Sequence, residues 1–150
     1  MGPRSAEQRR SDALVKLTAR HPDLWIASSS SSGRVHLVPL SFAWDGEHII
    51  IATETASLTT RNVSGSQVAR LALGATRDAV MIDVSLASVT PLSETPSEIK
   101  DCYAAQADWD PRSVDGDFVY LLLRPERIQA WREADEIEGR TVMRQGSWLV

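Results

Sequence analysis

The chain has 150 residues, of which 43% are hydrophobic and 24% are charged, and its net charge is −4 at neutral pH. This length suits one domain with a single core, and the composition is that of a soluble globular protein. The acidic balance argues against a surface for nucleic acid or for an anionic membrane. The single cysteine, Cys102, excludes an internal disulfide and a cysteine-based metal cage.

The sequence predicts neither a membrane span nor an export signal. Its apolar runs all fall short of the roughly 18 residues that cross a bilayer. No apolar signal core follows the opening residues Met1-Gly-Pro-Arg-Ser5. We therefore expect a cytoplasmic protein with no membrane partner and no nucleic-acid partner.

A helix is predicted over Ala6–Ala19. Ser5 and Gln8 form a capping box at its start, because their spacing lets each side chain bond the other's backbone N–H. Pro22 ends the helix, since the residue before a proline is disfavoured in the α region. The apolar residues share one face, and the cations are expected largely on the others: Arg9, Arg10, Lys16 and Arg20.

A β-hairpin follows, although the serine run Ser28–Ser32 has the composition of a linker. Apolar strands flank this run, Leu24–Ser28 before it and Val35–Trp44 after it, so Ser32-Gly33 is predicted to be the turn. The second strand is apolar on both faces, which indicates a position deep within a closed sheet. Pro39 inside it has no N–H and marks an edge, a bulge or a neighbour that is not a strand.

The rest of the chain alternates strands with short turns. Asp45-Gly46 is its strongest hairpin signal, and Thr95-Pro96-Ser97-Glu98 has the cap, the proline and the glutamate of a helix start. That helix is expected to end near Trp109–Pro111, and Pro125 is expected to bend the strand that precedes it. The predicted strands are His48–Thr53, Val68–Leu73, Val80–Val89 and Phe118–Leu123, then Arg127–Trp131 and a last pair, Arg140–Met143 and Trp148–Val150.

These elements predict a mainly β fold. About six strands with only two or three helices are typical of a small antiparallel barrel. No repeat or domain boundary is visible, so residues 1–150 are expected to form a single domain. Within it, residues 1–20 contain the N-terminal helix and residues 24–150 form the barrel.

The stretch Thr53-Glu-Thr-Ala-Ser57-Leu-Thr-Thr-Arg61-Asn62 follows directly on the apolar run Ile49–Ile51. Thr55 or Ser57 can cap a short helix there, which Ser64-Gly65 is expected to end. A strand that leads into a hydroxyl-rich helix start, with an arginine one turn in, resembles an anion site. The alternative is an ordinary helix start, where serine and threonine are common.

The sequence contains no classical catalytic motif. It has no Gly-x-Ser-x-Gly elbow, no His-Glu-x-x-His and no phosphate loop. Its histidines, His21, His36 and His48, are dispersed, so no metal site is predicted. His36 is of interest because its strand is expected to pass close to the hydroxyl-rich stretch; the alternative is a strand histidine bonded to a backbone carbonyl. Cys102 is expected to pack within its helix.

Several runs of this sequence match the pattern of a known protein family. The longest is Gly33–Thr53, followed by Ser57 and Arg61-Asn62, and the others are Ala69–Gly74, Thr76–Asp78, Trp109–Arg112, Ile128–Ala134 and Gly139–Met143. These runs resemble the flavin- and deazaflavin-dependent split-barrel oxidoreductases, the relatives of pyridoxamine 5′-phosphate oxidase. The resemblance implies a six-stranded antiparallel split barrel with Greek-key connections, flanked by short helices. It also implies a homodimer with two cofactor sites at the subunit interface. The five tryptophans are expected in the core and at a subunit interface, or stacked on a planar cofactor: Trp25, Trp44, Trp109, Trp131 and Trp148.

The resemblance also implies a cofactor, FMN or the deazaflavin coenzyme F-420, and the residues that bind it. Thr53 and Ser57 match the family's phosphate-binding hydroxyls, and Arg61-Asn62 match its Arg-Asn pair. In the family, one strand passes the ring system of the cofactor and offers it backbone groups. The matching residues here are Val38, Pro39, Leu40 and Ser41, with His36 earlier on the same strand. The implied reaction is hydride transfer to or from a small organic substrate.

The sequence departs from the family at Thr59, where a lysine usually reaches the phosphate. Charge-assisted hydrogen bonds are the strong ones, so we expect FMN to bind more weakly than in members that keep the lysine. Arg61 and Arg34 are left to supply the charge. The departure also keeps open a non-catalytic carrier or sensor of flavin, deazaflavin or haem, and a ligand-free barrel that serves as a dimer scaffold.

Overall fold

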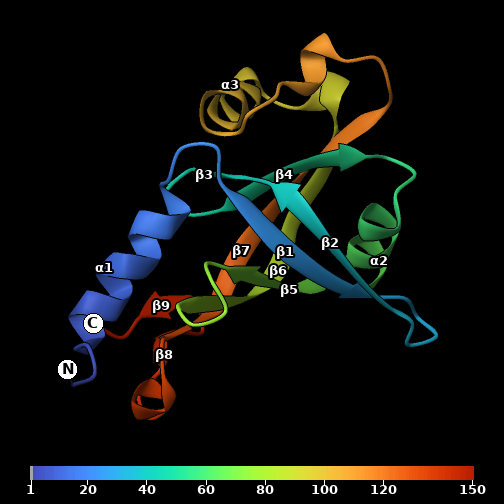
Figure 1. Ribbon diagram of the computed structural model, residues 1–150. Coiled ribbons are helices and arrows are strands. Elements are labelled where there is room, and N and C mark those ends of the chain that lie inside the picture. Colours follow the sequence, from blue (N-terminus) through green and yellow to red (C-terminus); the bar gives the residue numbers. More distant parts are fainter. Residues whose placement is uncertain (1) are drawn as a thin grey trace.

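A single antiparallel sheet forms the framework of the computed structural model, which describes residues 2–150 (Figure 1). The strands in these residues are β1 (Asp23–Ser29), β2 (Val35–Ser41), β3 (Ala43–Trp44), β4 (Ile49–Glu54), β5 (Val68–Leu73), β6 (Ala79–Pro91), β7 (Phe118–Trp131), β8 (Thr141–Arg144) and β9 (Ser147–Trp148). The helices are α1 (Ala6–Leu17), α2 (Leu58–Ser66) and α3 (Ser97–Gln106), with single 3-10 turns at Leu92–Glu94, Pro111–Ser113 and Ala134–Glu136. The prediction of a mainly β, split-barrel fold with few helices is confirmed.

The two longest strands, β6 and β7, form the spine of the sheet. They have 13 and 14 residues and pair antiparallel from Ala79 opposite Trp131 to Pro91 opposite Val119. From β6 the sheet continues through β5 and β1 to β2, and from β7 it continues through β4 to β3. β2 and β4 contact each other without pairing, so the sheet curls toward a barrel that stays split between them.

Pro125 lies inside β7, which continues to Trp131. The pairing of β7 with β6 slips between Asp83 and Val84, and Val84 lies opposite Pro125. A proline has no N–H to give to the ladder, so it is tolerated where the ladder is interrupted by a bulge. The predicted bend and the predicted further strand are therefore parts of one bulged strand.

Alternating residues of the strands fill the interior of the barrel. Val80, Ile82 and Val84 of β6 are each at most 2% exposed, as their period of two predicts. α1 covers this core with Ala13 and Leu17, which are fully buried. Burying a leucine-sized side chain contributes about 1.5–3 kcal/mol, so the apolar face of α1 is sufficient to hold the helix on the sheet.

β4 is buried on both faces, because a second apolar layer covers the side that does not face the main core. This layer consists of α3 and the segment after it, at the opposite end of the sheet from β8 and β9 (Figure 1). Ile50 of β4 and Tyr120 of β7 pack there against Tyr103 of α3, whose ring meets Tyr120 edge to face at 5.8 Å. The Tyr103 hydroxyl accepts a hydrogen bond from Trp109 Nε1 at 2.8 Å.

Four predicted helix boundaries differ from the structure. α3 ends at Gln106 rather than near Trp109–Pro111. α1 stops at Leu17 rather than Ala19. α2 runs past Ser64-Gly65 and is capped by Gln67, which has a φ of 67°. α3 begins after Pro96 without a side-chain cap, because the Thr95 hydroxyl donates instead to the Pro91 carbonyl at 2.8 Å.

The prediction that the second strand lies deep in the sheet is wrong. β2 is an edge strand that pairs only with β1 within residues 2–150. The predicted strand is interrupted at Phe42, which lies between the end of β2 and the start of β3. The side chains of β2 alternate between half-buried and exposed, with Val35 83% exposed and Leu37 60% exposed. Pro39 fits this position, because an edge strand leaves one row of backbone groups without a ladder partner.

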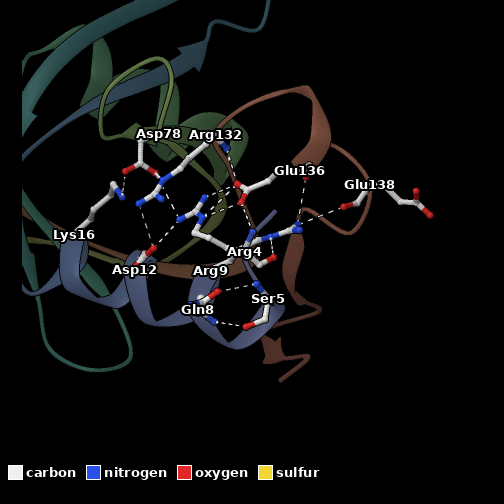
Figure 2. Close-up of polar contacts among 10 residues, drawn as sticks. All are labelled: Arg4, Ser5, Gln8, Arg9, Asp12, Lys16, Asp78, Arg132, Glu136 and Glu138. Atoms are coloured by element: carbon white, nitrogen blue, oxygen red, sulfur yellow. Dashed lines mark hydrogen bonds and ion pairs between the residues drawn. The ribbon is translucent and has the colours of Figure 1, made fainter. Parts of the chain in front are cut away.

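A partly buried ion cluster, with Arg4 and Glu136 at its buried centre, ties α1 to the turn at Ala134–Glu136 (Figure 2). The Arg4 guanidinium lies 2.7 Å from the Glu136 carboxylate and 2.8 Å from Asp12. The Glu136 side chain is 3% exposed and also accepts the backbone N–H groups of Arg4 and Arg132. Arg9, expected on a solvent face, is 6% exposed because its guanidinium donates to backbone carbonyls, including that of Glu136.

We expect acid to weaken this cluster. The pKa of Glu136 is lowered from 4.5 to about 2, chiefly by the hydrogen bond from Arg4 and against the opposing effect of burial. A carboxylate with a lowered pKa contributes stability above its ordinary pKa and loses it as the pH falls toward the folded value. Wild type should therefore lose stability steeply between about pH 5 and pH 2, measured by urea unfolding.

Glu136→Gln should be less stable than wild type by about 2–3 kcal/mol at pH 7, because it removes one partner of a buried pair. Its free energy of unfolding should fall less between pH 5 and pH 2. Parallel pH profiles for the two proteins would show that the carboxylate contributes nothing through its charge.

Candidate functional site

A chain of hydroxyl groups marks the junction of β4 and α2. Ser57 caps α2 by accepting the N–H of Thr60 at 3.1 Å, and its Oγ lies 3.4 Å from Thr53 Oγ1 and 3.0 Å from Thr60 Oγ1. The Thr60 hydroxyl donates onward to the Glu54 carbonyl at 2.8 Å. The structure thus brings Thr53 and Ser57 together, at a helix start where N–H groups and hydroxyls face the same region.

Thr59 and Asn62 lie on the face of α2 that packs against the sheet. Thr59 is 2% exposed and Asn62 is 6% exposed. The Asn62 amide donates to the Ser28 hydroxyl of β1 at 3.2 Å, which anchors the helix to the serine run. Both residues therefore offer a ligand little surface in the single chain.

Arg61 is an exposed residue of α2. It lines a hollow of about 420 Å³ together with Ser29–Ser31, Asn62, Gly65 and Ser66. Neither Thr53 nor Ser57 lines this hollow. Arg61 follows directly on Thr60 of the hydroxyl chain, and the hollow that it lines lies beside the turn between β1 and β2.

The predicted ring strand, β2, presents two different faces. Val38 and Leu40 are half-buried and pack against the main core, and His36 is half-buried, opposite Ser28 of β1. Pro39 is exposed on the other face. At the end of the strand, the Ser41 hydroxyl lies 3.1 Å from a carboxylate oxygen of Asp108, in the segment after α3, and 3.3 Å from one of Asp23.

Sequence reasoning missed an exposed apolar face on the outside of β1, β2 and β5. It consists of Trp25, Val35, Leu37 and Val68, which are between 50% and 83% exposed. Pairing places them on one side of the sheet, because Leu37 lies opposite Ala27, two residues after Trp25. Pro39 is the feature of the sequence that could have indicated this face, because a proline is compatible with an edge strand.

A second hollow, of about 620 Å³, opens on the same side of the sheet and was also missed. It shares Ser29 and Ser66 with the hollow of Arg61, so the two adjoin. Val35 and Val68 line it, together with an ion pair in which the Arg70 guanidinium lies 2.6 Å from the Asp83 carboxylate. Burial alone would raise the pKa of Asp83, but its bonds to Arg70 and Arg127 outweigh this and lower it.

The histidines lie apart in the fold. His48 bonds Asp45 through its ring Nδ1 at 3.1 Å, across the turn from β3 to β4, while His36 is on β2 and His21 precedes β1. Among residues 2–150, no three His, Cys, Asp or Glu residues gather closely enough to hold a metal ion. In the same part of the chain, no helix is long and apolar enough to cross a membrane.

A protein-family model described as pyridoxamine 5′-phosphate oxidase matches residues 11–132 of this chain. The chain belongs to this family. The match runs from within α1 to the end of β7, so it includes β2, the hydroxyl chain and both hollows. No curated protein matches the chain.

Solved structures agree with this family at the level of the fold. An F420 reductase aligns with a TM-score of 0.58 and 17% identity, over 76% of this chain and 94% of its own. A putative pyridoxamine 5′-phosphate oxidase from Listeria innocua gives 0.61 and 17%, over 80% and 95%. The haem storage protein HutZ from Vibrio cholerae gives 0.63 and 14%, over 81% and 94%. One split-barrel fold thus occurs in proteins with different ligands.

Thr59→Lys introduces the residue that is usual in the family, at a site that is almost closed in the single chain. We expect the free protein to lose about 1–3 kcal/mol of unfolding free energy, because a buried ammonium is desolvated. FMN affinity should rise by about 1–3 kcal/mol, the scale of a hydrogen bond to a charged group. Urea unfolding and FMN titration measure the two effects.

Leu58→Lys is the matched control, because Leu58 is 48% exposed on the same turn of α2 and a lysine there stays in water. It should leave stability and FMN affinity nearly unchanged. If Thr59→Lys behaves in the same way, the phosphate does not approach position 59.

Proposed function

We propose that this protein is a dimeric oxidoreductase that uses FMN or the deazaflavin coenzyme F-420 to transfer hydride to or from a small organic substrate. The observation that carries the proposal is the family match over residues 11–132, joined to the hydroxyl chain at the β4–α2 junction. The likeness to an F420 reductase supports the fold in which such chemistry occurs.

The residues present fit the polar chain and phosphate end of such a cofactor in part. Thr53 and Ser57 place two hydroxyls 3.4 Å apart beside the first free N–H groups of α2. These groups can donate to a polar chain or to an anion. The hydroxyls are neutral, however, and Thr59 stands where the family usually has a lysine, so the charge must come from elsewhere.

The fit for a planar ring rests on the free edge of β2. An edge strand leaves alternate N–H and C=O groups unpaired, and these can bond the polar edge of a flat ring. The segment Val38–Ser41 lies on this edge, and β2 approaches β4, whose last residues carry the hydroxyl chain. We propose that the ring lies along Val38–Ser41 and that His36 flanks it.

The cofactor and the protein would then have separate roles in the reaction. The bound cofactor supplies the two-electron hydride chemistry, whereas the protein positions it and excludes water. β2 fixes the ring through its backbone, and Thr53 and Ser57 fix the opposite end. This proposal requires no protein nucleophile, which agrees with a sequence that has no classical catalytic motif.

A non-catalytic carrier or sensor of flavin, deazaflavin or haem is the second candidate. The observation that favours it is Thr59, because weak retention of the phosphate suits release of a ligand better than repeated turnover. Likeness to the haem storage protein HutZ shows that the fold is not restricted to flavin chemistry. The absorbance spectrum separates the ligands, and a reduction assay separates carrier from enzyme.

We propose that the exposed apolar face, Trp25, Val35, Leu37 and Val68, is the dimer interface. A monomer rarely leaves so many large apolar side chains together in water. A second copy on this face would also border the hollow lined by Val35 and Val68. We expect the interface to bury over about 1,500 Å² in total, as stable dimers do.

Purified protein should show absorbance near 450 nm if it retains flavin, near 420 nm for deazaflavin, or a Soret band for haem. When it is purified without ligand, FMN or F-420 should bind in a titration followed by fluorescence, and a bound cofactor should change redox state with a small organic substrate. A protein that binds neither, whether purified from its source or after reconstitution, contradicts the proposed activity.

Leu37→Lys should convert the dimer to a monomer, because it places a charge in the middle of the apolar face. Val15→Lys is the matched control, since Val15 is 65% exposed but lies on α1, outside that face. Light scattering at micromolar concentration measures both masses. A monomeric wild type, or a dimer that survives Leu37→Lys, would rule out this interface.

A further inference from the structure

We propose that the hollow lined by Val35 and Val68 binds an organic cation. In this site the carboxylate of Glu126 takes a primary ammonium group, and the apolar walls take the body that carries it. The hollow has a volume of about 620 Å³. The inference goes beyond the proposed function and does not rest on it, because it concerns neither the flavin ring nor its phosphate.

Glu126 lines this hollow from the bulge in β7. The pairing with β6 passes from Arg127 to Pro125 without a partner for Glu126, which is therefore the extra residue of the bulge. Bulges are common next to functional sites, because the extra residue changes the direction of a side chain. The Glu126 carbonyl accepts the N–H of Gly146 at 2.9 Å, so the bulged backbone is held in place.

The negative charge of Glu126 has no cation to balance it within residues 2–150, where it takes part in no ion pair. The arginines of this part of the sheet are used by Asp83, since Arg70 and Arg127 lie 2.6 Å and 2.8 Å from its carboxylate. One oxygen of the half-buried Glu126 accepts the Ser85 hydroxyl at 2.6 Å. The other oxygen accepts no hydrogen bond from the described part of the chain, so it is free for a ligand.

The hydroxyl groups of the hollow offer lone pairs rather than protons. Ser29 and Ser66 donate their hydroxyl protons to neighbouring backbone carbonyls at 3.1 Å and 3.0 Å, and Ser85 donates to Glu126. A hydroxyl whose proton is already used can still accept a hydrogen bond. An ammonium has three donors and no acceptor, whereas a carboxylate has acceptors only. The hollow therefore favours a cation over an anion.

Apolar side chains supply much of the remaining lining, which consists of Ala27, Val35, Val68, Ala69 and Val84. Val84 is 2% exposed and Val35 is 83% exposed, so these walls extend from the packed sheet out to solvent. Covering them is favourable in proportion to the apolar area removed from water. A volume of about 620 Å³ is within the range of small-molecule sites and has room for a phenyl or short alkyl body.

Probes that share a phenyl body test the requirement for charge in the wild-type protein. Phenethylamine is an ammonium at neutral pH, 2-phenylethanol is neutral and 3-phenylpropionate is an anion. We expect phenethylamine to bind saturably, with a dissociation constant of about 1 mM or below, and the other two to bind at least about tenfold more weakly. Methylammonium, which lacks the apolar body, should also bind at least about tenfold more weakly.

The shifts of backbone amide resonances in residues 66–70 and 83–86 measure these affinities. Absence of saturable phenethylamine binding overturns the inference. So does an affinity for 2-phenylethanol, 3-phenylpropionate or methylammonium that equals that for phenethylamine. This comparison needs no variant, so it decides the inference even if a substitution in the hollow prevents folding.

Glu126→Gln removes the charge but keeps the size of the side chain and an oxygen for Ser85. It should weaken phenethylamine binding at least about tenfold and leave 2-phenylethanol binding within about twofold. Glu47→Gln is the matched control, because Glu47 is exposed in the turn from β3 to β4 and does not line this hollow. It should match wild type for both probes. Unchanged phenethylamine affinity in Glu126→Gln overturns the inference.

FMN titration of the same variants separates this site from the proposed function. Glu126→Gln should keep the FMN affinity of wild type within about twofold. A loss of FMN affinity as large as the loss for phenethylamine would assign the carboxylate to the flavin site and overturn the inference. A wild type that binds no flavin contradicts the proposed function, while the phenethylamine titration still decides the cation site.

Discussion

The antiparallel pairing of β6 and β7 is the constraint on which the rest of the structure depends. These two strands are the longest and pair along nearly their whole length. The other strands of the sheet are added in order on either side of this pair. β5, β1 and β2 extend from one side and β4 and β3 from the other, and curvature brings β2 back toward β4. The edge strand and the hydroxyl-rich junction, which are separate in the order of pairing, thereby become neighbours.

Local chemistry made much of this fold predictable from the sequence. Ser5 and Gln8 specify the start of α1, and the Asp45-Gly46 turn places β3 beside β4. The period of two in Val80–Val84 identifies the inward face of β6. Likewise, Ser57 caps α2 as its residue type suggests, so the meeting of Thr53 and Ser57 follows from their spacing around one tight junction.

The errors concern what lies next to an element rather than the element itself. β2 is apolar on both faces, and the sequence cannot show that its outer side has nothing to cover it in the single chain. Arg9 is buried because carbonyls from a turn over 120 residues away accept its N–H groups. The hollow of Arg61 depends on the same long-range packing, since α2 and the β1–β2 turn are brought together by the sheet and by Asn62. Periodicity carries no information about such partners.

The central claim is that the free edge of β2 and the β4–α2 segment form one ligand site. Amide hydrogen exchange with and without FMN tests it most directly, because unpaired edge amides exchange rapidly until a ligand covers them. The account predicts slower exchange in residues 35–41 and 53–66 on addition of FMN, with residues 97–106 of α3 unchanged. Protection confined to other segments, or protection of α3 with β2 unaffected, would contradict it.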